Sequence, residues 1–535
     1  MRLRGIATAL SFFILPAALP AQAPDTGQIV RAVEIQRNDI FDAVENTSWL
    51  TRLGNGLHIT TREGVVRREL LIAPGEPYDS ARAAETARNL RTLGIFRRVQ
   101  VDTVRTDSGL VMRVVTSDGW STRPDFRFRS TGGQADYTVA FIEDNLFGTA
   151  TQASIKYRNS TDRTSTSFGF LQPRFLSRTI RLGLEYQDRS DGRRYGALVG
   201  RPFYSLNSRS SYLFLLDDRR ERVLRFSNGE RIASDSLRRR YTLARFEGAV
   251  ALTSSSAGYL RAGVIGQYRE DAFRPEAPDS GFPAMGKTPS TGAVGLYVEA
   301  RRAHFILTRG FVGFAREEDV DVSTAVRVGA MVAPKSFGYE RDGIAPFISG
   351  RTGTSFGAGF LFADLHANGL YDSGGLDSGS VTLGATMVLQ PAPRHSIVLH
   401  GDAGWIRNPL PGEDFDLGLG SGPRAFHSHS FTGDRTYYAS AEYRYTLVQE
   451  LWKLVGVGLA GFVDHGGSWY NGSPRRTGWD AGIGVRLGAS RAAGVEAIRI
   501  DLARRFATDV DGAGWVIVVG KGLTFSTAPG ANRGS

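Results

Sequence analysis

The residues best suited to chemistry lie between positions 417 and 470, in a glycine-rich loop and the two segments that follow it. The loop carries Gly422-Pro423-Arg424-Ala425-Phe426, and the next two segments each hold one carboxylate, Glu442 and Asp464. An arginine shielded between two carboxylates forms charge-assisted, bidentate hydrogen bonds that position a loop, and a lysine does not reproduce that fork. The alternative is that all three are solvated surface charges, which contribute little to stability.

Enzymatic and metal-binding chemistry finds little support. His427 and His429 share one strand face by their alternate spacing, which suits weak metal binding, but no third ligand stands beside them. The strand-end histidines have no recognisable partner motif for nucleophilic catalysis: His366, His395, His400 and His465. Cysteine is absent, which excludes disulfides, thiolate catalysis and Cys-ligated metals. We therefore expect no enzymatic activity, no metal and no cofactor.

The composition is typical of strands and tight turns. The 535 residues include 64 Gly, 31 Phe, 18 Tyr and 7 Trp, and 41% are hydrophobic. Beyond the N-terminus, no stretch approaches the roughly 18 apolar residues of a transmembrane helix. A membrane β-barrel has such a sequence because its apolar residues occupy every second position. The net charge of +11 comes without a nucleic-acid-binding motif, so lumen-facing arginine or anionic lipid explains it better than nucleic acid does.

Residues 1–23 have the pattern of a secretory signal. Arg2 and Arg4 precede an apolar run from Gly5 to Leu19, and Ala21-Gln22-Ala23 supplies the small residues that a signal peptidase recognises. Pro24 hinders cleavage directly after Ala23, so a cut one or two residues earlier is the alternative. We expect export rather than anchoring.

Residues 28–119 predict a small α+β domain. Asp79 or Ser80 caps a helix that Gly94 ends, and turn residues separate the last two strands. The expected order is β-α-α-β-β, with these elements: a strand from Ile29 to Phe41, helices from Thr61 to Leu71 and from Asp79 to Leu93, and strands from Val99 to Val104 and from Leu110 to Val115.

Residues 124–525 predict only strands and loops, and residues 526–535 form a short tail. Segment 193–230 is ambiguous between further strands and a long loop. The protein is therefore expected to be mainly β, a transmembrane antiparallel barrel of about 16 strands preceded by the small domain. The expected strands are 137–144, 150–157, 164–170, 179–186, 241–252, 259–268, 294–300, 323–332, 357–366, 381–389, 396–405, 437–445, 455–462, 479–487, 498–506 and 515–525.

Several motifs resemble those of a known family. In the small domain, Asn89-Leu90-Arg91-Thr92-Leu93-Gly94-Ile95-Phe96 resembles the signature of a polypeptide-transport-associated (POTRA) domain, although any small α+β domain has helix, Gly and strand in that order. The rest resembles the BamA-like outer-membrane assembly factor superfamily, also called bacterial surface antigens. The motifs that carry this likeness are Glu143-Asp144-Asn145-Leu146-Phe147-Gly148, Leu171-Gln172-Pro173-Arg174-Phe175, Gly466-Gly467-Ser468-Trp469 and Gly520-Lys521-Gly522-Leu523-Thr524-Phe525.

This sequence departs from the family pattern at two points. The family loop commonly reads Val-Arg-Gly-Phe, whereas here Ala425 stands in place of the glycine. The terminal aromatic residue of the family corresponds to Phe525, which ten further residues follow.

The resemblance implies roles for particular residues. Arg424 would fold back into the barrel lumen and pair with Glu442 and Asp464, with Phe426 in the same network, and Phe525 would be the C-terminal assembly signal. The implied function is insertion or translocation of polypeptides at the outer membrane, with the POTRA domain in the periplasm. A client would bind a strand edge that the sequence does not identify.

Other functions remain open at this point. A dedicated secretion pore for one partner protein shares the architecture, and a passive porin or a lipid-handling barrel belongs to other classes. Outer-membrane lipid is an expected partner. Lipopolysaccharide is a further candidate, because the runs Arg219-Arg220-Glu221-Arg222 and Arg238-Arg239-Arg240 suit phosphate groups; the alternative is that they are solvated loops.

Overall fold

The computed structural model describes residues 27–523 and Phe525, with gaps at 42–45, 108, 132–133, 177–178, 228, 277–289, 313–316, 453, 491–495 and 507–509. The expected signal segment 1–23 and the tail 526–535 lie outside these residues. Within them, no helix has both the length and the apolar character needed to cross a membrane.

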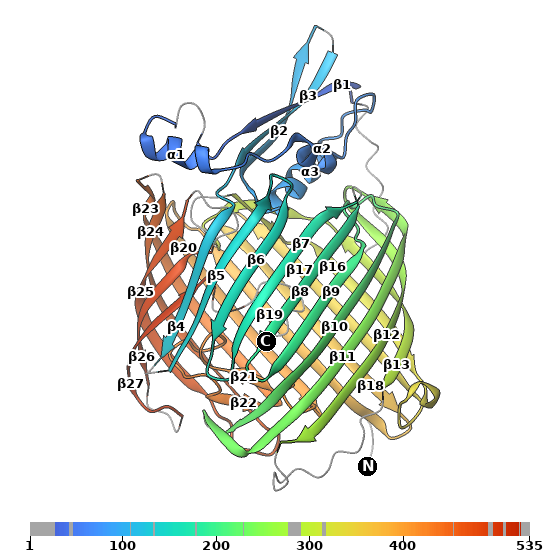
Figure 1. Ribbon diagram of the computed structural model, residues 1–535, viewed down its shortest axis with the longest axis vertical. Coiled ribbons are helices and arrows are strands. Elements are labelled where there is room, and N and C mark those ends of the chain that lie inside the picture. Colours follow the sequence, from blue (N-terminus) through green and yellow to red (C-terminus); the bar gives the residue numbers. More distant parts are fainter. Residues whose placement is uncertain are drawn as a thin grey trace.

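A small α+β domain precedes a large barrel and covers one of its ends (Figure 1). Its three-stranded sheet has the order β1-β3-β2, in which β1 is parallel and β2 antiparallel to β3. The sequence predicted two of its three helices and missed the first. The elements are β1 (Val30–Asn38), α1 (Trp49–Leu57), α2 (Glu63–Glu69), α3 (Ser80–Thr92), β2 (Phe96–Thr106) and β3 (Gly109–Asp118).

Helix α3 folds onto this sheet for the reasons that the sequence suggests. The Asp79 carboxylate accepts hydrogen bonds from the backbone N–H groups of Ala81 and Arg82, which caps the helix. Leu90 is fully buried in a core that includes Ile95 and Met112. The domain therefore has a hydrophobic core made mostly of its own residues, to which Ala150 of a turn in the barrel also contributes.

The barrel is closed and has twenty strands among the described residues, so the expectation of about 16 strands is wrong. All sixteen expected segments form strands, and β4, β9, β10 and β17 are additional. The strands are β4 (Thr122–Thr131), β5 (Gln134–Leu146), β6 (Thr151–Asn159), β7 (Thr164–Phe175), β8 (Ile180–Arg189), β9 (Gly192–Arg201), β10 (Ser210–Ser227), β11 (Glu230–Ser255), β12 (Gly258–Pro275), β13 (Thr291–Arg302), β16 (Thr324–Ala333), β17 (Gly343–Phe356), β18 (Gly359–Asp372), β19 (Gly375–Leu389), β20 (His395–Arg407), β23 (Arg435–Leu451), β24 (Val455–Trp469), β25 (Gly478–Ala489), β26 (Ile498–Arg505) and β27 (Gly514–Lys521).

Side chains alternate between the outer face and the lumen. On β24, Leu459 and Val463 are exposed on the outside, whereas Phe462 and Asp464 are buried inside. This period of two follows from the strand pleat. The barrel closes where β27 lies beside the first strand, β4, and an ion pair joins Lys521 to Asp125 across that seam.

Two of the family-like motifs attach the small domain to the barrel. The Asn145 side chain donates to Thr61 Oγ1 over 2.9 Å, and the backbone N–H of Arg62 donates to the Gly148 carbonyl over 2.9 Å. In the second motif, Arg174 forms an ion pair of 2.5 Å with the buried Glu69 of α2. These turns therefore hold the domain over one end of the barrel, which we call the domain-side mouth; the opposite end is the far end.

A second structure occupies the domain-side mouth. Residues 303–323, the mouth hairpin, connect β13 to β16 and contain the paired strands β14 (Phe305–Arg309) and β15 (Glu317–Asp321). Phe311 is buried, with an edge-to-face contact of 5.4 Å to Phe360 on β18. The Val312 carbonyl accepts from the backbone N–H of Ala497, and the Arg309 carbonyl accepts from the Gln390 side chain. The hairpin thus reaches from β13 to turns on the other side of the mouth.

Candidate functional site

The candidate site is the lumen loop, which we define as residues 408–434 between β20 and β23. It contains the short paired strands β21 (Phe415–Leu417) and β22 (Phe431–Gly433). Phe426 and Phe431 are fully buried, and their ring centroids lie 5.0 Å apart. Together with Leu417 they form a small apolar core with Tyr438 of β23 and Val510, which fixes the position of the polar residues beside it.

Arg424 lies at the centre of a buried polar network and is 3% exposed. Its Nε and Nη2 donate to the two carboxylate oxygens of Asp464 on β24, over 2.6 and 3.2 Å. Its Nη1 donates to Glu442 on β23 over 2.9 Å and to Asp501 on β26 over 3.3 Å. The flat face of the guanidinium lies 3.7 Å from the ring centre of Phe462. One loop side chain is therefore bonded to strands β23, β24 and β26.

Further arginines surround the same carboxylates. Arg486 on β25 bridges Glu442 over 3.0 Å and Asp501 over 2.5 Å. Arg444 donates to Glu442 over 2.7 Å, and its other end donates to the Phe311 carbonyl of the mouth hairpin over 2.7 Å. Glu442 thus contacts three guanidinium groups, and one of them connects the lumen loop network to the mouth hairpin.

The residue after Arg424 is held by its backbone. The Ala425 N–H donates to Asp480 on β25 over 3.0 Å, and the Ala425 carbonyl accepts from Arg505 on β26 over 3.1 Å. Ala425 is not among the loop residues with a left-handed backbone, which are Asn408, Gly412, Gly418, Gly420, Gly422 and His429. Position 425 therefore does not require the glycine that the family pattern has there.

Comparison with known proteins finds relatives for part of the chain. Part of this chain is similar to BamA. Over 147 residues it is 29% identical to outer membrane protein assembly factor BamA of Neisseria meningitidis, which covers 24% of this chain and 17% of that protein. Over 139 residues it is 24% identical to BamA of Neorickettsia risticii, covering 24% of this chain and 18% of the relative. The chain thus spans less than a fifth of the length of these relatives. No family model matches it.

Solved structures give more distant likenesses. BamA from Haemophilus ducreyi lacking POTRA domains 1–3 superposes with a TM-score of 0.38 at 11% identity, over 92% of this chain and 84% of that one. CdiB from Acinetobacter baumannii gives 0.44 at 10% identity, over 93% and 74%. CdiB from Escherichia coli gives 0.47 at 12% identity, over 92% and 76%.

The structure brings together the four residues that the BamA-like resemblance grouped. Arg424 contacts both Glu442 and Asp464, and Phe426 packs in the core of the same loop. The sequence analysis did not identify Asp501, Arg486 and the other participants. A signal for them existed, because β26 alternates strictly between exposed and buried residues, and its buried face carries Arg499, Asp501 and Arg505.

Phe525 does not lie on the last strand. β27 ends at Lys521, four residues earlier, so the expected strand boundary of 525 is wrong. The Phe525 ring stacks on His400 of β20 with a centroid distance of 3.6 Å, and it packs near Phe311 of the mouth hairpin. His400 faces the lumen and is buried. The role of Phe525 as an assembly signal stays a prediction, and here its side chain lies inside the barrel.

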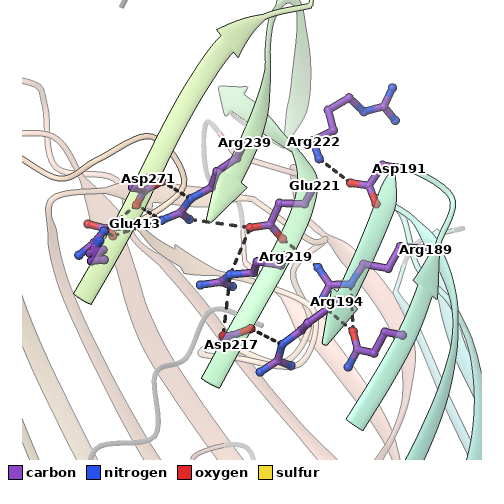
Figure 2. A network of polar contacts seen from close by, with 12 residues as sticks. Arg189, Asp191, Arg194, Asp217, Arg219, Glu221, Arg222, Arg239, Asp271 and Glu413 are labelled. Carbon is purple, nitrogen blue, oxygen red and sulfur yellow. Dashed lines mark hydrogen bonds and ion pairs between the residues drawn. The ribbon is translucent and has the colours of Figure 1, made fainter. Parts of the chain in front are cut away.

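The lumen loop is also bonded to the opposite wall. Glu413 accepts from Arg269 of β12 over 2.9 Å and lies 3.6 Å from Arg239 of β11. Arg239 in turn forms a bidentate pair with Asp271 over 2.8 and 2.6 Å. Figure 2 shows Glu413, Arg239 and Asp271 in a larger set that continues through Glu221 to Arg189 of β8 and through Asp217 to Arg194 of β9. The loop therefore spans the lumen between two walls of ion pairs.

The two loop histidines bond to acids of neighbouring segments and form no metal cluster within the part of the chain that the structure describes. His427 Nδ1 lies 2.8 Å from Asp511 in the connection between β26 and β27. His429 lies between Asp416 and Asp162, at 2.5 and 3.0 Å, and stacks on Phe226 at 3.6 Å. Both histidines thus anchor the far end of the lumen loop.

The His429 anchor predicts a pH dependence. Burial lowers the pKa of His429, but hydrogen bonds from the imidazole to Asp162 and Asp416 outweigh that effect and raise the pKa from 6.5 to about 10. The protonated His429 therefore contributes to the stability of the folded state. This contribution is complete below pH 6.5 and is lost as the pH rises through about 10. We expect proteolysis within the lumen loop to increase over that range in the folded protein. In His429→Gln, cleavage should be higher at pH 6.5 and should change less with pH; parallel profiles would contradict the assignment.

Proposed function

We propose that this chain is an outer-membrane protein of the BamA-like superfamily, with one POTRA domain in the periplasm, that inserts or translocates polypeptides. The observation that carries the proposal is the buried Arg424, which bonds the lumen loop to β23, β24 and β26 inside a barrel capped by an α+β domain. The proposed activity forms and breaks no covalent bond. It lowers the free energy needed to bring a client's unpaired backbone amides into lipid, where each unsatisfied amide costs several kcal/mol. Neither catalysis nor a cofactor is part of the proposal.

The filled lumen argues against a passive porin. The lumen loop spans the barrel from Glu413 to Arg424, and the mouth hairpin covers the domain-side mouth with Phe311 buried in it. A passive pore needs neither two lumen segments held by ion pairs nor a domain docked over its mouth. In the described part of the chain, the strands of each segment pair only with each other, and side-chain contacts and single backbone hydrogen bonds hold the segments to the wall, so both can be displaced without breaking the barrel.

The client-binding edge that we propose is β2. The sheet order places β1 and β2 at the two edges. The β1 edge is partly covered, because Val30 exchanges backbone hydrogen bonds with Gly75 and Glu76. The hairpin of β2 and β3 projects away from the barrel (Figure 1), which leaves β2 accessible. An extended client would add a strand there by main-chain hydrogen bonding.

The barrel exit that we propose is the seam between β4 and β27. The first strand of the barrel meets the last there, and Lys521 and Asp125 form an ion pair across it. Opening the seam would present unpaired strand edges to an incoming client, and the exchange would leave few backbone groups unsatisfied in the bilayer. Outer-membrane lipid would then contact both client and barrel.

A dedicated secretion pore for one partner protein is the second candidate. It is favoured by the same two displaceable lumen segments, since a client passing through the lumen would have to move both. The two candidates differ in route, because insertion uses the seam and secretion uses the lumen.

Photocrosslinking tests client capture. A photoreactive amino acid at Gln100 or Asp102, two exposed positions on β2, should crosslink to polypeptides in intact cells. Glu34 on β1 is the matched control, because it is exposed on the strand at the other edge of the same sheet. Capture of outer-membrane proteins from β2 alone would support insertion, and capture of one secreted protein would support secretion. Equal labelling from both strands, or none, would contradict the proposed edge.

A further inference from the structure

The outer face of the barrel carries an arginine patch toward the far end of strands β9 to β12. On β10, the residues Asp217, Arg219 and Glu221 face the lumen and belong to the inward set of Figure 2. By alternation the even-numbered residues of this strand face outward. The outward arginines of the four strands form the arginine patch: Arg193, Arg220, Arg222, Arg238, Arg240 and Arg274.

The strand register places these arginines directly opposite one another. Arg220 is paired with Arg193 on one side and with Arg240 on the other. Arg238 is paired with Arg222 and with Arg274. Like charges directly opposite each other destabilise a sheet. Four such pairs in one patch therefore need compensation from outside the sheet.

The acids on the same face compensate only in part. Arg238 reaches Glu276 over 3.0 Å, but Arg240 and Glu270 are 3.6 Å apart, and Arg193 and Asp188 are 4.0 Å apart. Among the described residues, no hydrogen bond or ion pair engages the guanidinium groups of Arg220 and Arg274, and both residues are exposed. Arg238 and Arg240 remain 56% and 55% exposed. The patch therefore offers several guanidinium groups with free donors.

Tyrosines and apolar residues define the level of the patch on the barrel. Tyr195 lies next to Tyr186 across the strand pair, with 5.2 Å between ring centroids, and Tyr195 is two residues from Arg193. Tyrosine is enriched at the membrane–water interface of barrels, with the apolar band on one side and headgroups on the other. The arginine patch lies on the side away from the apolar band, so it lies at headgroup level.

An apolar hollow adjoins the patch on the same strands. It has a volume of about 370 Å³ and lies on the outer face, where the contacting rings of Phe214 and Phe246 line it together with the small residues Ala197, Ala244 and Gly266. These small residues lie beside larger neighbours, which creates the depression. Leu216 lines the hollow and Arg220 is four residues further along β10, which corresponds to roughly 14 Å at the strand rise per residue.

From this geometry we propose that the outer face of β9 to β12 binds a phosphorylated glycolipid of the outer leaflet, of the lipopolysaccharide type. An acyl chain lies in the apolar hollow, and the phosphate groups bind the arginine patch. Guanidinium groups bind phosphate by bidentate, charge-assisted hydrogen bonds, which relieve the repulsion between paired arginines. The inference rests on the proposed function, because it takes the barrel to span an outer membrane with the small domain in the periplasm.

The test compares two lipids on the folded, full-length protein. The protein is placed in phosphatidylcholine nanodiscs with lipid A that carries both phosphates or with dephosphorylated lipid A, and bound lipid is counted by native mass spectrometry. We expect preferential retention of the phosphorylated form. The triple variant Arg220→Ala, Arg240→Ala, Arg274→Ala should weaken that retention on the order of 100-fold, since each surface arginine contributes about fivefold. Competition by millimolar inorganic phosphate should be weak.

Two further variants separate the parts of the site. Arg302→Ala is the matched control, because Arg302 is an exposed arginine at the domain-side end of the neighbouring strand β13, away from the arginine patch. This variant should retain both lipids as the native chain does. Ala244→Phe fills the hollow and should reduce retention of both lipids while the arginines stay in place. Equal retention of the two lipids, or unchanged retention by the triple alanine variant, would overturn the inference. Displacement by inorganic phosphate would indicate a free-anion site and would also overturn it.

Failure of the glycolipid site and failure of the proposed function give different results. A chain that does not fold into nanodiscs would contradict the membrane barrel itself. A chain that folds there and captures clients but shows no preference for phosphorylated lipid would contradict the glycolipid site alone.

Discussion

Replacing Arg424 with alanine should detach the lumen loop and abolish most of the protein's function while the barrel still folds. The substitution leaves Asp464, Glu442 and Asp501 without the cation that bridges them, and all three are buried. Removing one partner of a buried ion pair costs about 3–5 kcal/mol. Limited proteolysis should therefore cut residues 408–434 in Arg424→Ala but not in the native chain. Heat-modifiable migration on gels should be retained, which shows that the barrel is intact.

Companion variants test the geometry of the network. Arg424→Lys should be nearly as impaired as alanine, because an ammonium cannot form the two parallel bonds to Asp464. Glu442→Gln should be more harmful than Asp464→Asn. The Glu442 change removes the charge that three arginines share, whereas after the Asp464 change Arg424 still contacts Glu442 and Asp501. An Arg424→Ala protein with a protected loop and full activity would contradict this account.

Replacing Phe311 with alanine should open the domain-side mouth. The Phe311 ring packs against Phe360 and Phe362, and its removal leaves a cavity where the mouth hairpin docks. Loss of a buried phenylalanine typically costs about 3–5 kcal/mol. We expect larger and more frequent ion-conducting openings in planar bilayers, because the hairpin contributes to closing the lumen.

Leu307→Ala is the control for the hairpin. Leu307 lies on β14 of the same hairpin but is 53% exposed, so its removal should leave conductance unchanged. Arg444→Gln should increase conductance partway, because it removes the bond from the lumen network to the Phe311 carbonyl. If Phe311→Ala and Leu307→Ala conduct alike, the mouth hairpin does not close the lumen.

The strands that the sequence missed share a physical cause. β4 has its charged residues on one face, but Pro124 interrupts it and only Phe126 and Phe128 form its apolar face, so its pattern is short. β17 contains Pro346 together with Gly350 and Gly353 and shows no clean alternation. β10 extends past the apolar band, where arginines face both the lumen and the outside. Alternation of apolar and polar residues identifies a strand only where its outer face meets an apolar surface.

The sequence predicted only those residues of the candidate site that belong to a recognisable motif. A loop arginine and two acids on strands have recognisable motif order, and the structure brings Arg424, Glu442 and Asp464 together. Asp501 and Arg486 have no such motif, and only the closed barrel places β25 and β26 beside the loop. The position of Phe525 depends on how the chain turns after Lys521, which no strand pattern encodes.

Crosslinking the seam tests the proposed insertion mechanism most directly. Cysteines at Asp125 and Lys521 would be joined by a cleavable bifunctional maleimide, and the chain has no other cysteine to react. The matched control joins Ile500→Cys and Val519→Cys, which are paired across β26 and β27 away from the seam. Insertion of newly made outer-membrane proteins would be measured in proteoliposomes before and after cleavage of the linker. The account predicts that the seam crosslink stops insertion and cleavage restores it, while the control crosslink has no effect. Full insertion by the protein locked at the seam would contradict it.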